Sequence, residues 1–97
     1  MIRSFADRGT EDVFNRRNSR QALRCCPAAV REVARRKLDM LNAAVSLGSL
    51  RLPPGNALEA LKGDRQGQHA IRINGQYRVC FIWTPEGPAE VAIVDYH

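Results

Sequence analysis

The spacing of the apolar residues changes near residue 55, and this change limits the fold more than any other feature of the sequence. Between Pro27 and Gly48, apolar residues recur at intervals of three and four, which predicts a helix that buries one face. These residues are Val30, Val33, Ala34, Leu38, Leu41 and Val45. The segment 52–55, Leu-Pro-Pro-Gly, can be neither helix nor central strand, and beyond Leu58 apolar and polar residues alternate. We therefore expect an α+β domain whose helices precede its strands.

Two short elements are expected before this helix. Residues 1–5 alternate in polarity, which predicts a short edge strand. Thr10 is followed by two acidic residues, and acids are favoured at the positive end of a helix dipole, so Thr10 is the expected N-cap of a first helix. Val13 and Phe14 are its expected buried residues.

Four strands are expected in the second half, at residues 58–62, 69–73, 76–83 and 91–97. In the last of these, alternation places Asp95 and His97 on one face and Tyr96 on the other. A carboxylate two residues before an imidazole can orient the ring or hold its proton. This pair is therefore a candidate for acid/base chemistry.

The dipeptide Asn74-Gly75 predicts a two-residue hairpin turn, which sets the strand register. Arg72 would then lie opposite Tyr77, and His69 opposite Cys80. One face of the hairpin would carry Ala70, Arg72, Tyr77, Val79, Phe81 and Trp83, and the other His69, Ile71, Ile73, Gln76, Arg78, Cys80 and Ile82. Both faces are partly apolar, so we expect one, with its aromatic residues, to pack under the helices and the other to line a cleft.

The length of 97 residues predicts one domain, residues 1–97. The longest run without a charge, Leu41 to Leu50, is too short to span a membrane, and early charges predict no secretory signal. Three cysteines, two of them adjacent, are typical of a reduced cytoplasmic chain. No CxxC or HxxxH spacing is present, so we expect neither a metal nor another cofactor. The alternative is a zinc site of Cys80, His69, Asp95 and His97.

The net charge of +5 lies entirely in the first 40 residues, where ten basic residues face five acidic ones. Of the 15 basic residues in the chain, 13 are arginine, whose planar group suits phosphates and carboxylates. The pattern favours a nucleic acid or an acidic protein as partner, and the alternative is a solvated surface that only aids solubility. The long predicted helix carries Arg31, Arg35, Arg36 and Lys37 on its polar faces. Arg35 is four residues before Asp39, so we expect one of these charges to form a surface ion pair.

Three segments carry a family resemblance. They are LEALKGDR at 58–65, IRINGQYRVCFIW at 71–83 and VAIVDYH at 91–97, and the segments MIRSF at 1–5 and ARRKLDMLNAA at 34–44 agree with them. Together they resemble the HigB toxins, a branch of the RelE/ParE superfamily also called plasmid maintenance system killer proteins. The resemblance covers nearly the whole chain.

The resemblance implies a RelE-like fold, with two N-terminal helices packed on a small, mostly antiparallel sheet. It implies an endoribonuclease that cleaves mRNA in the ribosomal A site without a metal. It also implies a HigA-like helix-turn-helix antitoxin, which binds the toxin and links it to operator DNA. The basic helical residues would then contact rRNA or be covered by the antitoxin.

The family's functional residues fall on Lys62, Arg78, Asp95, Tyr96 and His97. His97 would transfer protons, Asp95 would orient it or act as its partner, and Arg78 and Lys62 would stabilise the transition-state charge. Several members have a histidine where this chain has Glu59, so Glu59 is the candidate for the second acid/base group.

Structural alternatives stand beside these roles. Arg78 could pair with a carboxylate of the sheet, Lys62 could be a solvated turn residue, and His69 a packed sheet residue. A different function is also open, because ParE toxins of the same superfamily inhibit gyrase by protein contact, and a basic binding module would carry similar arginines. The terminal Asp95-Tyr96-His97 segment favours the nuclease, since an inhibitor needs no proton-transfer groups there.

Overall fold

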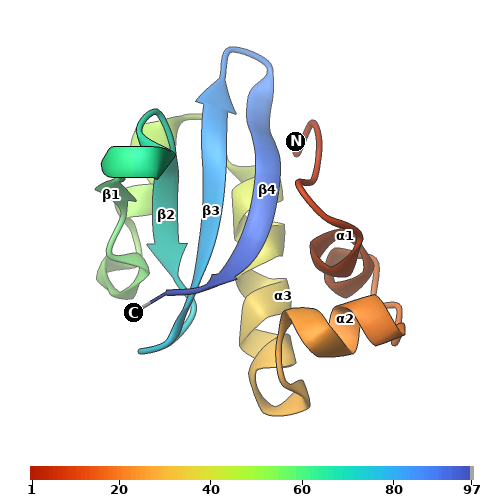
Figure 1. Ribbon diagram of the computed structural model, residues 1–97. Helices are drawn as coiled ribbons and strands as arrows, with labels where there is room; N and C mark the ends of the chain where they lie inside the picture. Colours follow the sequence, from red (N-terminus) through yellow and green to blue (C-terminus); the bar gives the residue numbers. More distant parts are fainter. Residues whose placement is uncertain (97) are drawn as a thin grey trace.

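A four-stranded antiparallel sheet and three α-helices form the protein, which the computed structural model describes for residues 1–96 (Figure 1). The strands are β1 (Glu59–Ala60), β2 (His69–Arg72), β3 (Tyr77–Thr84) and β4 (Gly87–Asp95), and they lie side by side in this order. The α-helices are α1 (Arg8–Phe14), α2 (Arg20–Cys25) and α3 (Ala28–Ala43), and the 3-10 helices are η1 (Leu47–Arg51), η2 (Pro54–Asn56) and η3 (Gly63–Arg65). The predicted α+β class is confirmed, although the sequence predicted two helices and α2 was missed.

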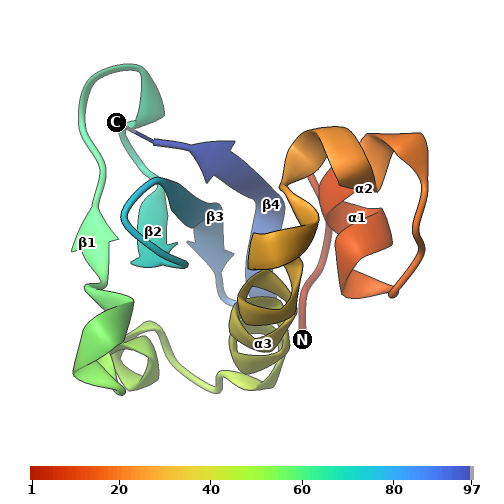
Figure 2. The same cartoon turned by 90° about the horizontal axis from the view of Figure 1, so that it is seen from below.

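The helices cover only one face of the sheet. Helix α3 lies against this face, and α1 and α2 pack together beside β4 (Figure 2). The core between them contains Val13, Leu38, Leu41, Leu50, Ile71, Val79, Phe81 and Val91. Tyr77 and Trp83 pack against this core, as predicted. None of the helices in residues 1–96 combines the length and the apolar character needed to cross a bilayer.

The first helix begins earlier than predicted. Its N-cap is Asp7, whose Oδ1 accepts a hydrogen bond from the backbone N of Thr10 at 2.6 Å. Thr10 itself is buried within α1, and its Oγ1 accepts a hydrogen bond from the backbone N of Ile93 in β4 at 2.9 Å. The Thr10 N-cap was therefore wrong, because this hydroxyl joins the helix to the sheet.

The N-terminal segment follows β4 without forming a full strand. Phe5 makes an isolated parallel bridge with Val91, and the backbone N of Arg3 donates to the carbonyl of Pro88 at 2.7 Å. The predicted edge strand at residues 1–5 is thus reduced to one bridge. It still shields the outer edge of β4.

Helix α3 ends five residues before the predicted stop at Gly48. Its buried face contains Arg31, Ala34, Leu38 and Leu41. Val45 lies beyond the helix and is 91% exposed, so its assignment to the buried face was wrong. The segment 52–55 forms a connection, as predicted, but Pro54 and Gly55 are themselves part of the 3-10 helix η2, so the expectation of no helix was wrong for them.

Buried Asn56 holds the connection after α3 in place. Its Nδ2 donates to the carbonyl oxygens of Leu50 at 3.0 Å and Leu52 at 3.3 Å, and its Oδ1 accepts from Nζ of Lys37 at 2.5 Å. Burial lowers the pKa of Lys37, and the charge of Arg36 lowers it further. The amide thus provides hydrogen-bond partners for two buried or partly buried backbone carbonyls and for one partly buried cation.

We expect Asn56→Ala to lower the free energy of unfolding by about 2 to 3 kcal/mol, because it leaves buried polar groups without partners. Urea denaturation followed by circular dichroism measures the change. Asn15→Ala, at an exposed position after α1, is the matched control and should cost less than about 1 kcal/mol. Equal stability of the two variants would contradict this role for Asn56.

The hairpin between β2 and β3 has a three-residue loop, and the predicted register was wrong by one residue. Arg72 lies opposite Arg78, and His69 lies opposite Phe81. The side chain of Asn74 causes the difference, because its Oδ1 accepts hydrogen bonds from the backbone N of Gln76 and of Tyr77 at 2.9 and 2.8 Å. The shift exchanges the faces of β2 relative to β3.

Candidate functional site

The face of the sheet that the helices leave open has a small apolar floor. Leu61, Ala70 and Cys80 are buried there, and Val94 packs against them. Residues opposite each other on antiparallel strands share a face, so the pairs Glu59–Ala70, Arg72–Arg78 and Arg78–Val94 place their charged side chains beside this floor. A second, partly apolar face is therefore present as predicted, but with a different set of residues, since His69, Ile71 and Ile73 lie on the core side.

Arg78 is held in the centre of this face. Its Nη1 donates to the carbonyl oxygens of Asn74 at 2.6 Å and Tyr77 at 3.1 Å, and its guanidinium carbon lies 5.4 Å from the ring centroid of Tyr96. Cation–π contact and two carbonyl acceptors orient the group without neutralising it. Within residues 1–96, all ion pairs involve Asp12 or Asp39, so the alternative that Arg78 pairs with a sheet carboxylate was wrong for this part of the chain.

Two further arginines, which sequence reasoning missed, complete what we call the arginine cluster, Arg65, Arg72 and Arg78. Nε of Arg72 donates to the same carbonyl of Asn74 as Arg78, at 3.2 Å, and Nη1 of Arg65 donates to Oε1 of Gln68 at 3.2 Å. Like charges directly opposite each other destabilise a sheet. A bound anion would relieve this repulsion, and only the correct register could have revealed the Arg72–Arg78 pair.

The pKa of the Cys80 thiol depends on three charged side chains of the open face. Burial raises its pKa, the positive charges of Arg65 and Arg78 act in the opposite direction, and the negative charge of Glu59 raises it further. The charges of these three side chains thus act on the same buried thiol of the open face. Glu59 and Lys62 are exposed, and neither makes a side-chain hydrogen bond or ion pair within residues 1–96. Lys62 immediately precedes η3, which carries Arg65.

Asp95 lies on the other side of the sheet from Arg78, because it is the partner of Tyr77. Nε2 of Gln76 donates to its Oδ2 at 3.1 Å. Alternation therefore separates Asp95 from Tyr96 as predicted, and His97 lies outside the described residues. The structure gathers Arg78, Tyr96 and Glu59 on one face and leaves Asp95 at the end of β4, where the chain continues to His97.

A hollow of about 450 Å³ lies between α1, α2 and β4, and Asp95 is one of the residues that line it. Cys25 lines it, together with Arg8 and Arg24. Burial raises the pKa of the Cys25 thiol to about 11, so it is protonated at neutral pH. This hollow therefore lacks an activated nucleophile.

The four basic residues predicted to contact rRNA differ in exposure. Arg31 is only 8% exposed, and its Nη1 donates to Oδ1 of Asn18 at 3.2 Å, so its predicted place on an exposed face was wrong. Nε of Arg35 donates to the carbonyl of Val13, and Lys37 contacts Asn56. Arg36 is exposed.

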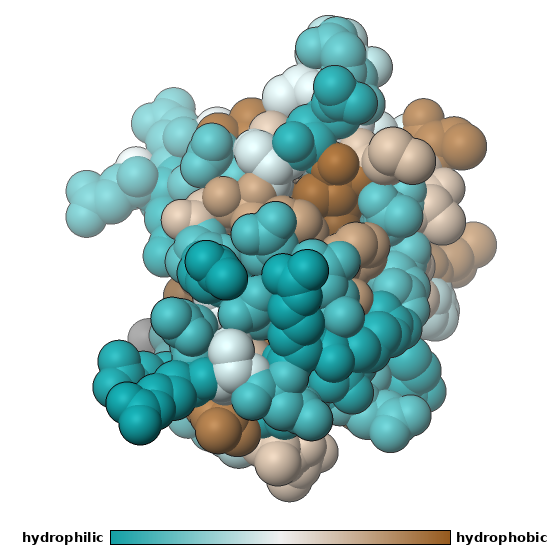
Figure 3. Space-filling view, turned by 90° about the vertical axis from the view of Figure 1, so that its right-hand side faces the viewer, coloured by the Kyte–Doolittle hydropathy of each residue, from teal (hydrophilic) through white to brown (hydrophobic). Residues whose placement is uncertain are grey.

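The rest of the basic surface lies over α1 and α2, where hydrophilic side chains cover most of the face (Figure 3). Exposed arginines there are Arg8, Arg16, Arg17, Arg20 and Arg24. Asp39 forms its ion pair with Arg16 at 2.6 Å, so the alternative of a pair with Arg35 was wrong. Helix α2 thus adds charge to a surface that the sequence assigned to α3.

His69 and Cys80 cannot share the proposed zinc site, because they project to opposite faces of the sheet. Residues 1–96 contain no group of three or more histidine, cysteine or acidic side chains that could hold a metal. His69 instead stacks on Phe81, with ring centroids 6.3 Å apart. It is a packed sheet residue and does not share the face of Arg78.

Comparison with known proteins agrees with this architecture. Residues 3–97 match the family described as the RelE-like toxin of the type II toxin–antitoxin system HigB. The chain is 40% identical over 74 residues to Toxin HigB-1 of Vibrio cholerae, which covers 76% of this chain and 77% of the relative. It is also 40% identical over 55 residues to an uncharacterised protein of Haemophilus influenzae, covering 57% of this chain and 54% of that protein. The chain belongs to the HigB family of RelE-like toxins of type II toxin–antitoxin systems.

Proposed function

We propose that this toxin is a ribosome-dependent, metal-independent endoribonuclease that cleaves mRNA in the A site. The observation that carries the proposal is the arginine cluster on the open face, in which Arg78 contacts Tyr96 and no carboxylate pairs with any of the three arginines within residues 1–96. Such a face suits a phosphodiester backbone with an adjacent base. Family membership adds the expectation that the target is translated mRNA.

The proposed chemistry uses the 2′-hydroxyl of the RNA as nucleophile. A base must remove its proton, a cation must stabilise the pentavalent phosphorane, and an acid must protonate the leaving 5′-oxygen. We assign phosphorane stabilisation to Arg78 with Lys62, and proton transfer to His97 oriented by Asp95. Glu59, exposed on β1, is the candidate for the second acid/base group, and Tyr96 stacks on a base or donates a hydrogen bond.

The proposed partners are the ribosome, mRNA and a HigA-like helix-turn-helix antitoxin, all met in the cytoplasm. Operator DNA would be bound only through the antitoxin complex. Of the basic residues on α3, Arg36, Arg35 and Lys37 would approach rRNA phosphates. Buried Arg31 would instead hold the segment between α1 and α2 through Asn18.

Salt dependence tests this docking role. The affinity of the protein for 30S subunits should fall steeply with salt, and Arg36→Ala should reduce the slope of log K against log salt by about 1, because one phosphate contact is lost. Arg51→Ala, an equal loss of charge at η1, should leave the slope unchanged. Identical slopes for wild type and Arg36→Ala would remove Arg36 from the docking surface.

The ParE-like alternative is tested with the same purified protein. Primer extension on mRNA in translating extracts should show new 5′ ends only when ribosomes are present, while DNA supercoiling by gyrase should be unaffected. Inhibition of gyrase without RNA cleavage would overturn the proposal. Cleavage of naked mRNA at the same rate would overturn its ribosome dependence.

A further inference from the structure

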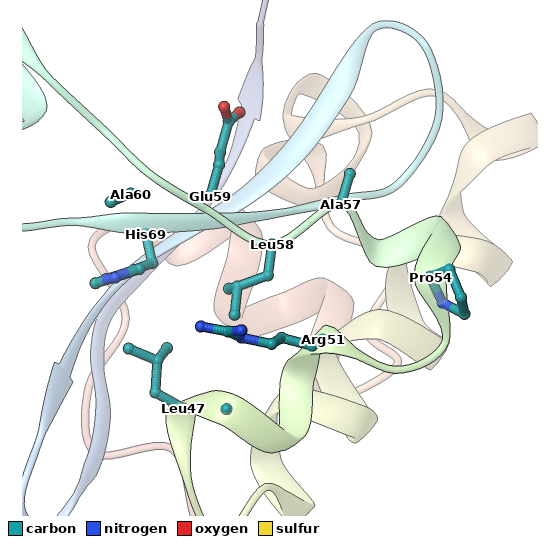
Figure 4. A pocket seen from close by; sticks show the side chains of 9 residues that line it. Leu47, Arg51, Pro54, Ala57, Leu58, Glu59, Ala60 and His69 are labelled. Carbon is teal, nitrogen blue, oxygen red and sulfur yellow. The ribbon is translucent and has the colours of Figure 1, made fainter.

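A cavity of about 430 Å³ lies beneath the β1 edge of the sheet, on the face opposite the arginine cluster. Its walls come from η1, η2, the segment 57–60 and the start of β2. Leu47 and Leu58 provide apolar surface, and Ala60 and His69, which are partners across β1 and β2, close one end (Figure 4). The volume falls in the range of pockets that bind ligands or partner side chains.

Two polar groups at this cavity lack partners. The guanidinium of Arg51 lies between Leu47 and Leu58 (Figure 4), and Arg51 makes no side-chain hydrogen bond or ion pair within residues 1–96. Nδ1 of His69 is buried and has no hydrogen-bond partner there. The carboxylate of Glu59 points away from Arg51 (Figure 4). Apolar walls with a free cation and an unsatisfied imidazole nitrogen suit an apolar side chain followed by a carboxylate.

The apolar surface continues beyond the cavity. Val45 and Leu52, at the two ends of η1, are 91% and 69% exposed. Exposed apolar residues that flank a pocket-lining segment are typical of a protein contact. A small molecule in the cavity would leave both side chains in water, whereas a segment of another protein could cover them.

We propose that this cavity is a docking site for the antitoxin, which inserts an apolar side chain between Leu47 and Leu58 and places a carboxylate at Arg51 and His69. The charge of Arg51, which has no carboxylate partner within residues 1–96, favours an acidic segment in this role. The proposal rests on membership of a type II toxin family, which has an antitoxin as partner, and it does not require the nuclease activity. It also leaves the open face of the sheet uncovered by this contact.

The test uses the cognate antitoxin, which is first to be identified among the products of the neighbouring reading frames by its co-purification with the toxin. Isothermal titration calorimetry should show that Arg51→Glu weakens the complex by about 30-fold or more, because a buried carboxylate would then face a like charge. Arg3→Glu, an equal charge reversal at an exposed residue beside β4, is the matched control and should change the affinity less than about threefold. Arg51 is exposed, so the variant should keep the wild-type melting temperature.

Hydrogen exchange provides the second measurement. Antitoxin binding should protect the amides of residues 57–60 and of His69 in the wild-type complex. Unchanged affinity of Arg51→Glu, or an equal loss in Arg3→Glu, would overturn the proposal, as would protection confined to α1 and α2. If the same amides were protected by self-association of the toxin in the absence of antitoxin, the cavity would bind a second copy of the toxin. This result would also overturn the proposal. Because binding is measured without RNA, these outcomes are independent of the nuclease proposal.

Discussion

Arg78→Ala is expected to lower the rate of ribosome-dependent mRNA cleavage by about 100- to 1000-fold, the usual effect of removing one oriented donor from a transition state. The guanidinium is fixed by two carbonyl oxygens and by Tyr96, so little reorganisation is needed when charge develops on the phosphate. Single-turnover cleavage of a ribosome-bound mRNA measures the rate. Sedimentation with 70S ribosomes should show that the variant still binds.

The matched control is Arg3→Ala, which removes the same charge from an exposed position beside β4. It should retain wild-type cleavage. Arg78→Lys should recover part of the rate, since it restores charge without the bidentate geometry. Equal rates for Arg78→Ala and wild type would remove the arginine cluster from the chemistry.

His97→Ala is expected to lower the cleavage rate by about 100- to 10,000-fold, because it removes the proposed proton-transfer group. An imidazole titrates near neutral pH, so the variant should also lose the change in rate that the wild type shows there. Measurement of the cleavage rate between pH 5 and pH 8 tests both effects.

Asp95→Asn separates orientation from proton transfer. If Asp95 only positions the imidazole, Asp95→Asn should lower the cleavage rate less than His97→Ala does. The rate of this variant should still change with pH near neutrality. Full activity of His97→Ala at every pH would contradict this assignment. Glu59→Gln then tests the second acid/base group. If Glu59 has this role, the variant should lose the other pH-dependent part of the curve of cleavage rate against pH.

The strands and the core face of α3 were predictable from sequence because burial imposes a regular spacing on apolar residues. Leu38 and Leu41 lie in the core as expected, and so do Val79 and Phe81. Helix α2 was missed because Ala22 is its one buried residue in the range Arg20–Cys25, so no apolar stripe marks it. Its position is instead fixed by an N-cap, the hydroxyl of Ser19.

The candidate site was predictable only in part. Alternation within β4 correctly separated Tyr96 from Asp95, but the contact of Tyr96 with Arg78 depends on pairing between strands. A single hydrogen-bonding side chain, Asn74, lengthened the hairpin loop and brought Arg72 beside Arg78. Local spacing does not encode such a choice. Arg31 is likewise held by Asn18, a residue of the connection between α1 and α2 that the spacing within α3 does not place.

We propose above that this toxin cleaves mRNA on the ribosome through the 2′-hydroxyl of the RNA. The most direct measurement programs 70S ribosomes with an mRNA whose A-site codon carries 2′-deoxynucleotides and compares it with the all-ribose mRNA. If the 2′-hydroxyl is the nucleophile, we expect cleavage of the ribose codon, a 2′,3′-cyclic phosphate on the product, and no cleavage of the deoxy codon. Equal cleavage of both mRNAs, or of neither, would contradict it.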